Sequence, residues 1–203
     1  MAEHRIPLEP ENVYHVYTHA NGSENLFREE ENYLYFLRKY AERIHPIVET
    51  FAYCLMPNHL HFMIRVRSLE HLSALRGFET LEGLELSERI SRQFSHLFNG
   101  YTQAYNNRFQ RKGSLFIPRC KRKRVENDAY FTRLIAYIHN NPVHHHFVRD
   151  LCEWAHSSWH SYLLDKPTRI SKDEGLSWFG GREEFVKIHQ ELRAKDVILD
   201  FEM

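Results

Sequence analysis

Two short segments combine residue types that could hold a metal ion and supply a nucleophile. The first runs Met56-Pro57-Asn58-His59-Leu60-His61. Alternate side chains of a strand share a face, so His59 and His61 would point to one side while Leu60 and Phe62 point into the core. Two imidazoles placed in this way can bind one divalent ion at about 2.0–2.1 Å. For an isolated motif this short, two histidines on a half-exposed sheet face are the more common outcome.

The second segment is Tyr137-Ile138-His139-Asn140-Asn141-Pro142. Tyr137 and Asn141 are four positions apart, so on a helix they lie one turn apart on one face. The amide oxygen of Asn141 could be a third metal ligand while the Tyr137 phenol projects toward the same ion. The alternative is a core tyrosine followed by a helix-ending Asn-Pro.

Other histidines and cysteines fit these two segments less well. His15 and His19 alternate poorly with the proposed metal strand, and His139 falls on a different helical face from Tyr137. The run His144–His146 is interpreted as a solvated loop. Cys54 is interpreted as a buried thiol rather than a zinc ligand, because Pro57 interrupts the register between it and the histidines.

A strongly basic segment indicates an anionic partner. Between Tyr101 and Arg124 there is no Asp or Glu, and the rest of a chain of net charge zero therefore carries −8. The eight cationic residues are Arg108, Arg111, Lys112, Arg119, Lys121, Arg122, Lys123 and Arg124. They could neutralise phosphates and make binding salt-dependent, although a solvated loop would have the same composition. Four interleaved aromatics could stack unpaired bases, but most are expected in the core: Tyr101, Tyr105, Phe109 and Phe116.

Length and composition place the chain among globular proteins. Its 203 residues suit one sizeable domain with an extension, and an apolar content of 42% is enough to bury a core. Apolar runs are far shorter than the ~20 residues of a membrane helix, and the first residues do not resemble a secretory signal. Three widely spaced cysteines argue against a disulfide framework, which suits a reducing cytoplasm.

The hydrophobic pattern predicts an α+β fold. Strands are expected at 14–19, 47–56, 59–67, 114–117 and 119–125, and Ser68–Glu85 is interpreted as an irregular insertion. One helix is expected to carry Phe27, Leu34, Leu37, Tyr40, Ala41 and Ile44. A second would be capped by Ser87, and a third capped by Asn127 or Asp128 and ended by Pro142. Further helix is expected near the C-terminus.

Several ordered blocks resemble the HUH endonucleases of the single-tyrosine transposase class, and within it the REP-associated tyrosine transposases. The resemblance spans roughly Tyr14 to Tyr162. The blocks are Tyr14-His15-Val16, Met56–His61, the Tyr101…Tyr105-Asn106 helix end, Gly113–Phe116 with its basic strand, Tyr137…Val143, and Ser157-Ser158-Trp159-His160-Ser161-Tyr162. Six blocks in order make coincidence improbable.

The resemblance implies a ferredoxin-like antiparallel sheet with helices on one face. The domain with this resemblance is expected at 10–165. An irregular insertion at about 68–86 and a helical C-terminal extension at 166–203 are expected from the residues themselves and match the family less clearly. His59, His61 and Asn141 would hold Mg²⁺ or Mn²⁺, and Tyr137 would be the nucleophile. The basic residues would bind DNA.

The implied activity is metal-dependent nicking and joining of single-stranded, hairpin-forming DNA through a 5′-phosphotyrosine. A phenol titrates near about 10, so it needs deprotonation or a polarised phosphate to react at neutral pH. The expected setting is the cytoplasm, at the nucleoid, with a monomer or a homodimer as the active form.

Two other functions fit the same residues. A catalytically inert ferredoxin-like nucleic-acid-binding protein would use only the basic strand and the aromatics. A hydrolytic metalloenzyme would use metal-bound water, although no general base is evident near the histidines.

Overall fold

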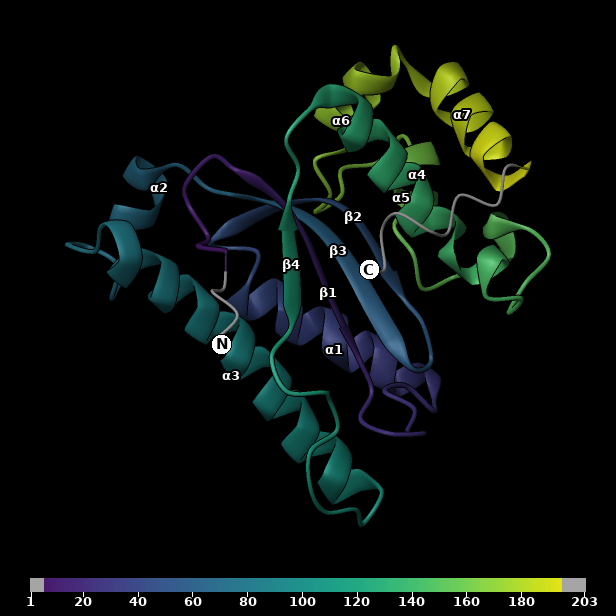
Figure 1. Ribbon diagram of the computed structural model, residues 1–203. Helices are drawn as coiled ribbons and strands as arrows, with labels where there is room; N and C mark the ends of the chain where they lie inside the picture. Colours follow the sequence, from purple (N-terminus) through teal and green to yellow (C-terminus); the bar gives the residue numbers. More distant parts are fainter. Residues whose placement is uncertain (1–5, 195–203) are drawn as a thin grey trace.

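The computed structural model describes residues 6–194 and is built around one antiparallel sheet (Figure 1). Its strands are β1 (Val13–His19), β2 (Val48–Leu55), β3 (His59–Val66) and β4 (Lys121–Arg124). They lie in the order β2-β3-β1-β4, with every neighbouring pair antiparallel. This order, with helical connections after β1 and β3, is the ferredoxin-like arrangement, so the expected fold class is confirmed.

Helices make up most of the rest of the described chain. They are α1 (Glu30–Arg43), α2 (Leu69–Ser73), α3 (Gly83–Arg108), α4 (Asp128–His144), a 3₁₀ turn η1 (Leu151–Glu153), α5 (Trp159–Leu163), α6 (Lys172–Phe179) and α7 (Arg182–Ala194). None of the helices within residues 6–194 is both long enough and apolar enough to cross a membrane.

Helices α1 and α3 cover one face of the sheet. A capping box between Glu29 and Asn32 starts α1, which buries Tyr33, Phe36 and Tyr40. On this face of the sheet, β3 presents the apolar side chains that strand alternation predicts. They pack against the buried residues of α1 and α3 and form one hydrophobic core with them. Leu34, expected on the buried face of α1, is instead 59% exposed.

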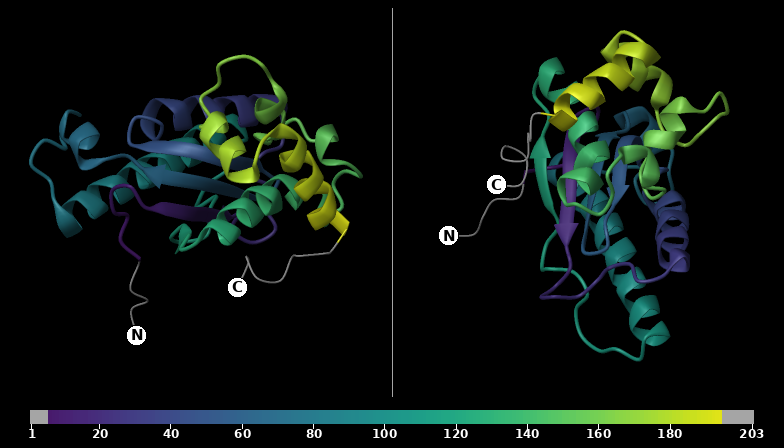
Figure 2. Two further views of the ribbon diagram at one scale, coloured as in Figure 1. Left: turned by 90° about the horizontal axis from the view of Figure 1, so that it is seen from above. Right: turned by 90° about the vertical axis from the view of Figure 1, so that its right-hand side faces the viewer.

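The second face of the sheet is also covered, by α4 (Figure 2). The expectation of helices on one face is therefore incomplete. The reason lies in β2 and β3, which carry Phe51, Ala52, Cys54 and Met63 in a second buried cluster with α4. A sheet that is apolar on both faces requires a cover on each.

Three local predictions differ from the structure. Residues 114–117 form no strand; an isolated bridge joins Ala20 to Phe116. Helix α3 begins at Gly83 rather than after Ser87, whose hydroxyl is buried and accepts a hydrogen bond from the Leu8 amide at 2.7 Å. The segment expected to be irregular at 68–86 contains α2 and the buried Phe78.

The segment Ser157–Tyr162 fastens the C-terminal part of the chain to the outer strand β2. Ser157 forms an antiparallel bridge with Cys54, and the Ser158 hydroxyl accepts a hydrogen bond from the Tyr53 amide at 2.9 Å. The Tyr162 hydroxyl donates to the Phe51 carbonyl at 2.8 Å. One backbone bridge and two side-chain hydrogen bonds thus take the place of the ladder partners that an edge strand lacks.

Beyond this segment, α6 and α7 pack on α4. The predicted boundary between a catalytic domain at 10–165 and an extension at 166–203 remains a prediction, and residues 195–203 of that extension lie outside the described residues.

Candidate active site

The register between β1 and β3 brings four histidines to one face of the sheet. His59 lies opposite His19, and His61 lies opposite Tyr17, with His15 two positions further along β1. Directly opposed residues of an antiparallel pair share a face. The prediction that His15 and His19 do not share a face with the histidines of β3 was therefore wrong. It considered each strand alone, without the pairing register between β1 and β3.

Helix α4 places the second segment over these histidines. The Asn127 side chain caps it by accepting a hydrogen bond from the Tyr130 amide at 2.9 Å, as predicted. The helix continues past Pro142 to His144, although Pro142 was expected to end it. Tyr137 and Asn141 thus occupy successive turns above the sheet.

The Tyr137 ring lies beside His61. Their ring centroids are 5.6 Å apart and the rings are perpendicular. The His15 ring is 6.2 Å from that of Tyr137, also edge-on. A second phenol, Tyr17, flanks His61 from β1 at 5.8 Å in a stacked arrangement.

His59 has an amide oxygen at each of its ring nitrogens. Nδ1 lies 2.8 Å from Asn58 Oδ1, and Nε2 lies 2.7 Å from Asn141 Oδ1. A neutral imidazole carries one N–H and can satisfy one of these acceptors. The other contact requires a second proton, a shared cation, or an Asn amide turned so that its NH₂ group faces the ring. The second choice suits a divalent ion, whose adjacent ligands at about 2.1 Å lie about 3 Å from each other.

The second ring nitrogen that could bind a metal ion belongs to His61. Its Nδ1 lies 2.9 Å from His15 Nε2, whereas its Nε2 is buried with no hydrogen-bond partner among the described residues. Burial, followed by the neighbouring histidines, holds the pKa of His61 well below its usual value, so the ring is neutral. If its Nε2 carries the lone pair, this neutral ring could serve as a metal ligand.

This donor set could hold a divalent cation. His59 and His61 supply nitrogens and Asn141 supplies an oxygen. Nowhere in residues 6–194 do three or more His, Cys, Asp or Glu side chains gather as a metal site. The remaining ligand positions would be taken by water or phosphate oxygens, as Mg²⁺ prefers, and the two imidazoles also suit Mn²⁺.

Tyr137 is enclosed by its neighbours. Its side chain is only 3% exposed and belongs to the cluster under α4. A phosphodiester can reach the phenol only after neighbouring side chains or part of α4 shift.

The end of α4 adds two histidines that were expected in a solvated loop. The His145 ring lies 4.7 Å from that of His59, and the His144 ring lies 6.3 Å from that of Tyr137. His146 is exposed, as expected.

His139 points away from the candidate site. Its two ring nitrogens are hydrogen-bonded to the Ser158 hydroxyl and to the His189 ring. Cys54 is fully buried, as expected, and burial raises its pKa.

The basic residues divide between the two faces of the sheet. Lys121 and Lys123 of β4 lie opposite Tyr17 and His15, and so on the histidine face. Arg122 and Arg124 point to the other face. There Arg122 donates to the Ser91 hydroxyl at 2.8 Å.

Several of the remaining cations have partners within the protein. Arg111 binds Glu24, the Asn106 side chain and the Ser114 carbonyl, and so holds the loop after α3 together. Arg108 and Arg124 pair with Glu29 and Glu9 on the surface. Lys112 and Arg119 are exposed. Tyr101, Tyr105 and Phe116 are buried, which confirms that the aromatics of this segment are mainly core.

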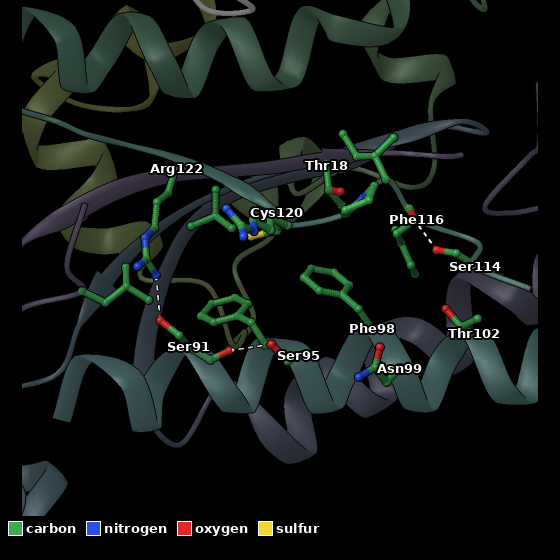
Figure 3. Close-up of a pocket in the computed structure, with 16 residues that line it drawn as sticks. Thr18, Ser91, Ser95, Phe98, Asn99, Thr102, Ser114, Phe116, Cys120 and Arg122 are labelled. Atoms are coloured by element: carbon green, nitrogen blue, oxygen red, sulfur yellow. Dashed lines mark hydrogen bonds between the residues drawn. The ribbon is translucent and has the colours of Figure 1, made fainter. Parts of the chain in front are cut away.

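A separate cavity lies on the opposite side of the sheet from the histidines. Its volume is about 470 Å³, and it lies between α3 and the strands β1 and β4. Figure 3 shows Phe98 and Asn99 of α3 facing Thr18 of β1 and Cys120, which immediately precedes β4, across it. Because the sheet separates this cavity from Tyr137, it is not part of the candidate active site.

Comparisons with known proteins found a relative in sequence and a similar fold. No model of a known protein family matches the chain. A protein of Haemophilus influenzae named as a REP-associated tyrosine transposase is 26% identical over 115 residues, which cover 55% of this chain and 59% of that protein. A solved structure of a REP-associated tyrosine transposase bound to a REP hairpin superposes with a TM-score of 0.59 at 18% identity, covering 80% of this chain and 86% of the other.

The chain resembles a REP-associated tyrosine transposase in sequence and in fold. The match in sequence spans less than two thirds of the Haemophilus influenzae protein. The match in structure, at its low identity, concerns the fold.

Proposed function

We propose that this protein is a metal-dependent endonuclease and strand transferase of single-stranded, hairpin-forming DNA, with Tyr137 as its nucleophile. The observation that carries the proposal is the position of the Tyr137 ring, 5.6 Å from the His61 ring and one helical turn from Asn141, which meets His59 at 2.7 Å. A phenol, two imidazoles and an amide oxygen from distant parts of the chain thus meet in one place.

His59, His61 and Asn141 would hold Mg²⁺ or Mn²⁺. When bound, the ion supplies Lewis-acid stabilisation of the charge that builds on the phosphate. The Tyr137 oxygen attacks phosphorus, the bond from phosphorus to the 3′-oxygen breaks, and the phenol proton is transferred to that oxygen. The products are a 5′-phosphotyrosine and a free 3′-hydroxyl. Attack by a 3′-hydroxyl on the phosphotyrosine reverses the step and joins strands without ATP.

Lys121 and Lys123 are the cations best placed to hold DNA at this site, because they lie on the histidine face at the edge of the sheet. The named activity of the similar proteins and the hairpin bound in the similar structure support a hairpin DNA as the partner. We infer a cytoplasmic, nucleoid-associated protein that acts as a monomer or a homodimer.

A labelled DNA hairpin with single-stranded flanks, incubated with Mn²⁺ or Mg²⁺ and resolved on a denaturing gel, tests the proposal. The wild type should form a covalent protein–DNA adduct, and Tyr137→Phe should bind the hairpin without forming it. Tyr17→Phe is the matched control, because Tyr17 presents the other phenol at His61. An adduct that persists in Tyr137→Phe and disappears in Tyr17→Phe would reassign the nucleophile.

The inert nucleic-acid-binding protein is the second candidate, favoured by the low exposure of Tyr137. It predicts binding without adduct in the wild type. Cleavage without any tyrosine-linked product would instead indicate metal-dependent hydrolysis.

A further inference from the structure

We propose that His15 is a positioning residue for the metal site, which fixes His61 in the one tautomer that can bind a cation. The inference rests on the proposed function, since it concerns the same site. His15 itself would touch neither the metal nor DNA.

The contact joins two buried rings. His15 Nε2 lies 2.9 Å from His61 Nδ1, and both side chains are fully buried. At this distance and without solvent, the two nitrogens must share one hydrogen. Either His61 donates from Nδ1 to His15, or His15 donates from Nε2 to His61.

Only the first arrangement leaves a metal ligand. A neutral imidazole has one hydrogen, so His61 with its hydrogen on Nδ1 has a bare lone pair on Nε2. That Nε2 is the buried atom with no hydrogen-bond partner among residues 6–194. In the second arrangement the hydrogen would sit on His61 Nε2 and point to where the cation belongs. A metal-binding histidine commonly donates its other N–H to a fixed acceptor, and here that acceptor is an imidazole.

Packing keeps the acceptor in place. The His15 ring stacks on Tyr17 with centroids 4.6 Å apart, and it stacks on His61 at 5.1 Å with planes 17° apart. The position on β1 is fixed by strand pairing, with Met63 opposite His15 on one side and Lys123 on the other. His15 Nε2 is therefore held in one position beside His61 Nδ1.

The tautomer can be measured in metal-free protein. Long-range ¹H–¹⁵N spectra of histidine-labelled protein, with His61 identified by the signals lost in His61→Gln, should show the hydrogen on Nδ1. In His15→Phe the hydrogen should move to Nε2, the usual tautomer of an unconstrained ring. A wild-type His61 with its hydrogen on Nε2 would overturn the proposal, and this measurement requires no variant of His15 to fold.

Manganese affinity, measured by calorimetry without DNA, gives a second readout. We expect His15→Phe to weaken Mn²⁺ binding about 10–100-fold, the usual effect of losing such a partner. His15→Gln, whose amide oxygen can accept from Nδ1–H, should restore most of the affinity. His96→Phe, on the exposed side of α3, is the control and should change nothing. Unchanged affinity in His15→Phe, or equal losses in both His15 variants, would contradict a role in setting the tautomer.

Failure of the proposed function is distinguishable from failure of this inference. If His59→Ala with His61→Ala bound Mn²⁺ like the wild type, the metal site itself would be wrong. The tautomer of His61 in metal-free protein would still report on His15.

Discussion

His59 Nε2 lies 2.7 Å from Asn141 Oδ1, and this contact joins the central strand β3 to helix α4 across 82 positions of sequence. It connects the two segments that carry the chemistry. With the Asn58 oxygen at the other ring nitrogen, a neutral His59 has one hydrogen for two oxygens, and a cation between His59 and Asn141 would satisfy this arrangement.

Removing both metal-binding histidines should separate cleavage from DNA binding. In His59→Ala with His61→Ala we expect loss of adduct formation and of Mn²⁺ binding, because both nitrogen ligands are gone. Hairpin affinity should fall by less than about threefold, since the basic residues supply most of it. Filter binding and gel assays on one preparation measure both. A parallel loss of hairpin binding would indicate a structural role for the histidines.

The lysines on the histidine face should account for part of the salt dependence. For single-stranded DNA, each phosphate contact that is lost makes the plot of log binding constant against log salt concentration less steep by about 0.7. Lys121→Ala with Lys123→Ala should therefore reduce this slope by about 1.4. The control with the same charge change is Lys39→Ala with Lys187→Ala, on α1 and α7, which should leave the slope unchanged. Equal effects of the two pairs would mean that DNA responds to net charge rather than to this edge.

Acidification should destabilise the contact between α4 and α7. His189 is fully buried, and burial lowers its pKa from 6.5 to about 3. Between these values the unfolded chain takes up a proton that the folded protein does not, so stability falls as pH drops below about 6.5. This group alone predicts a loss of about 2 kcal/mol from pH 7 to pH 5.

Urea unfolding at the two pH values, compared between wild type and His189→Gln, measures that loss. The variant should show a shallower pH dependence, whereas His96→Gln, an exposed histidine, should keep the wild-type dependence. Identical slopes in all three proteins would show that another group is responsible.

Gly175 is required by the close approach of Tyr162. A Cβ at position 175 would lie 2.3 Å from the Tyr162 hydroxyl oxygen and 2.9 Å from its ring, and that hydroxyl is hydrogen-bonded to β2. Gly175→Ala should destabilise the protein by about 1–3 kcal/mol in urea unfolding. Gly100→Ala is the matched control, because Gly100 is also helical but has nothing within 4 Å of its Cβ position. It should stabilise by up to about 1 kcal/mol, and similar effects at both positions would contradict the packing argument.

Local periodicity determined much of this protein from the sequence alone. Alternation along β3 sends Leu60 and Phe62 to one side and His59 and His61 to the other, and the structure confirms both directions. The four-residue spacing of Tyr137 and Asn141 gave their shared helical face, and Asn127 gave the start of that helix. These features depend on the geometry of a single strand or helix, which neighbouring residues specify.

Only the tertiary structure decided what lies across the sheet. His15 meets His61 because β1 pairs with β3 in one register, and no local pattern states the register between strands 46 positions apart. Arg111 and Arg122 look like DNA contacts in a basic run, yet Glu24 and Ser91, brought near by folding, bind them. Helix α4 likewise covers the second face of the sheet because apolar residues from several strands lie together on that face. Such contacts are set by packing between distant segments, so the sequence supplied the reactive groups and the fold determined their partners.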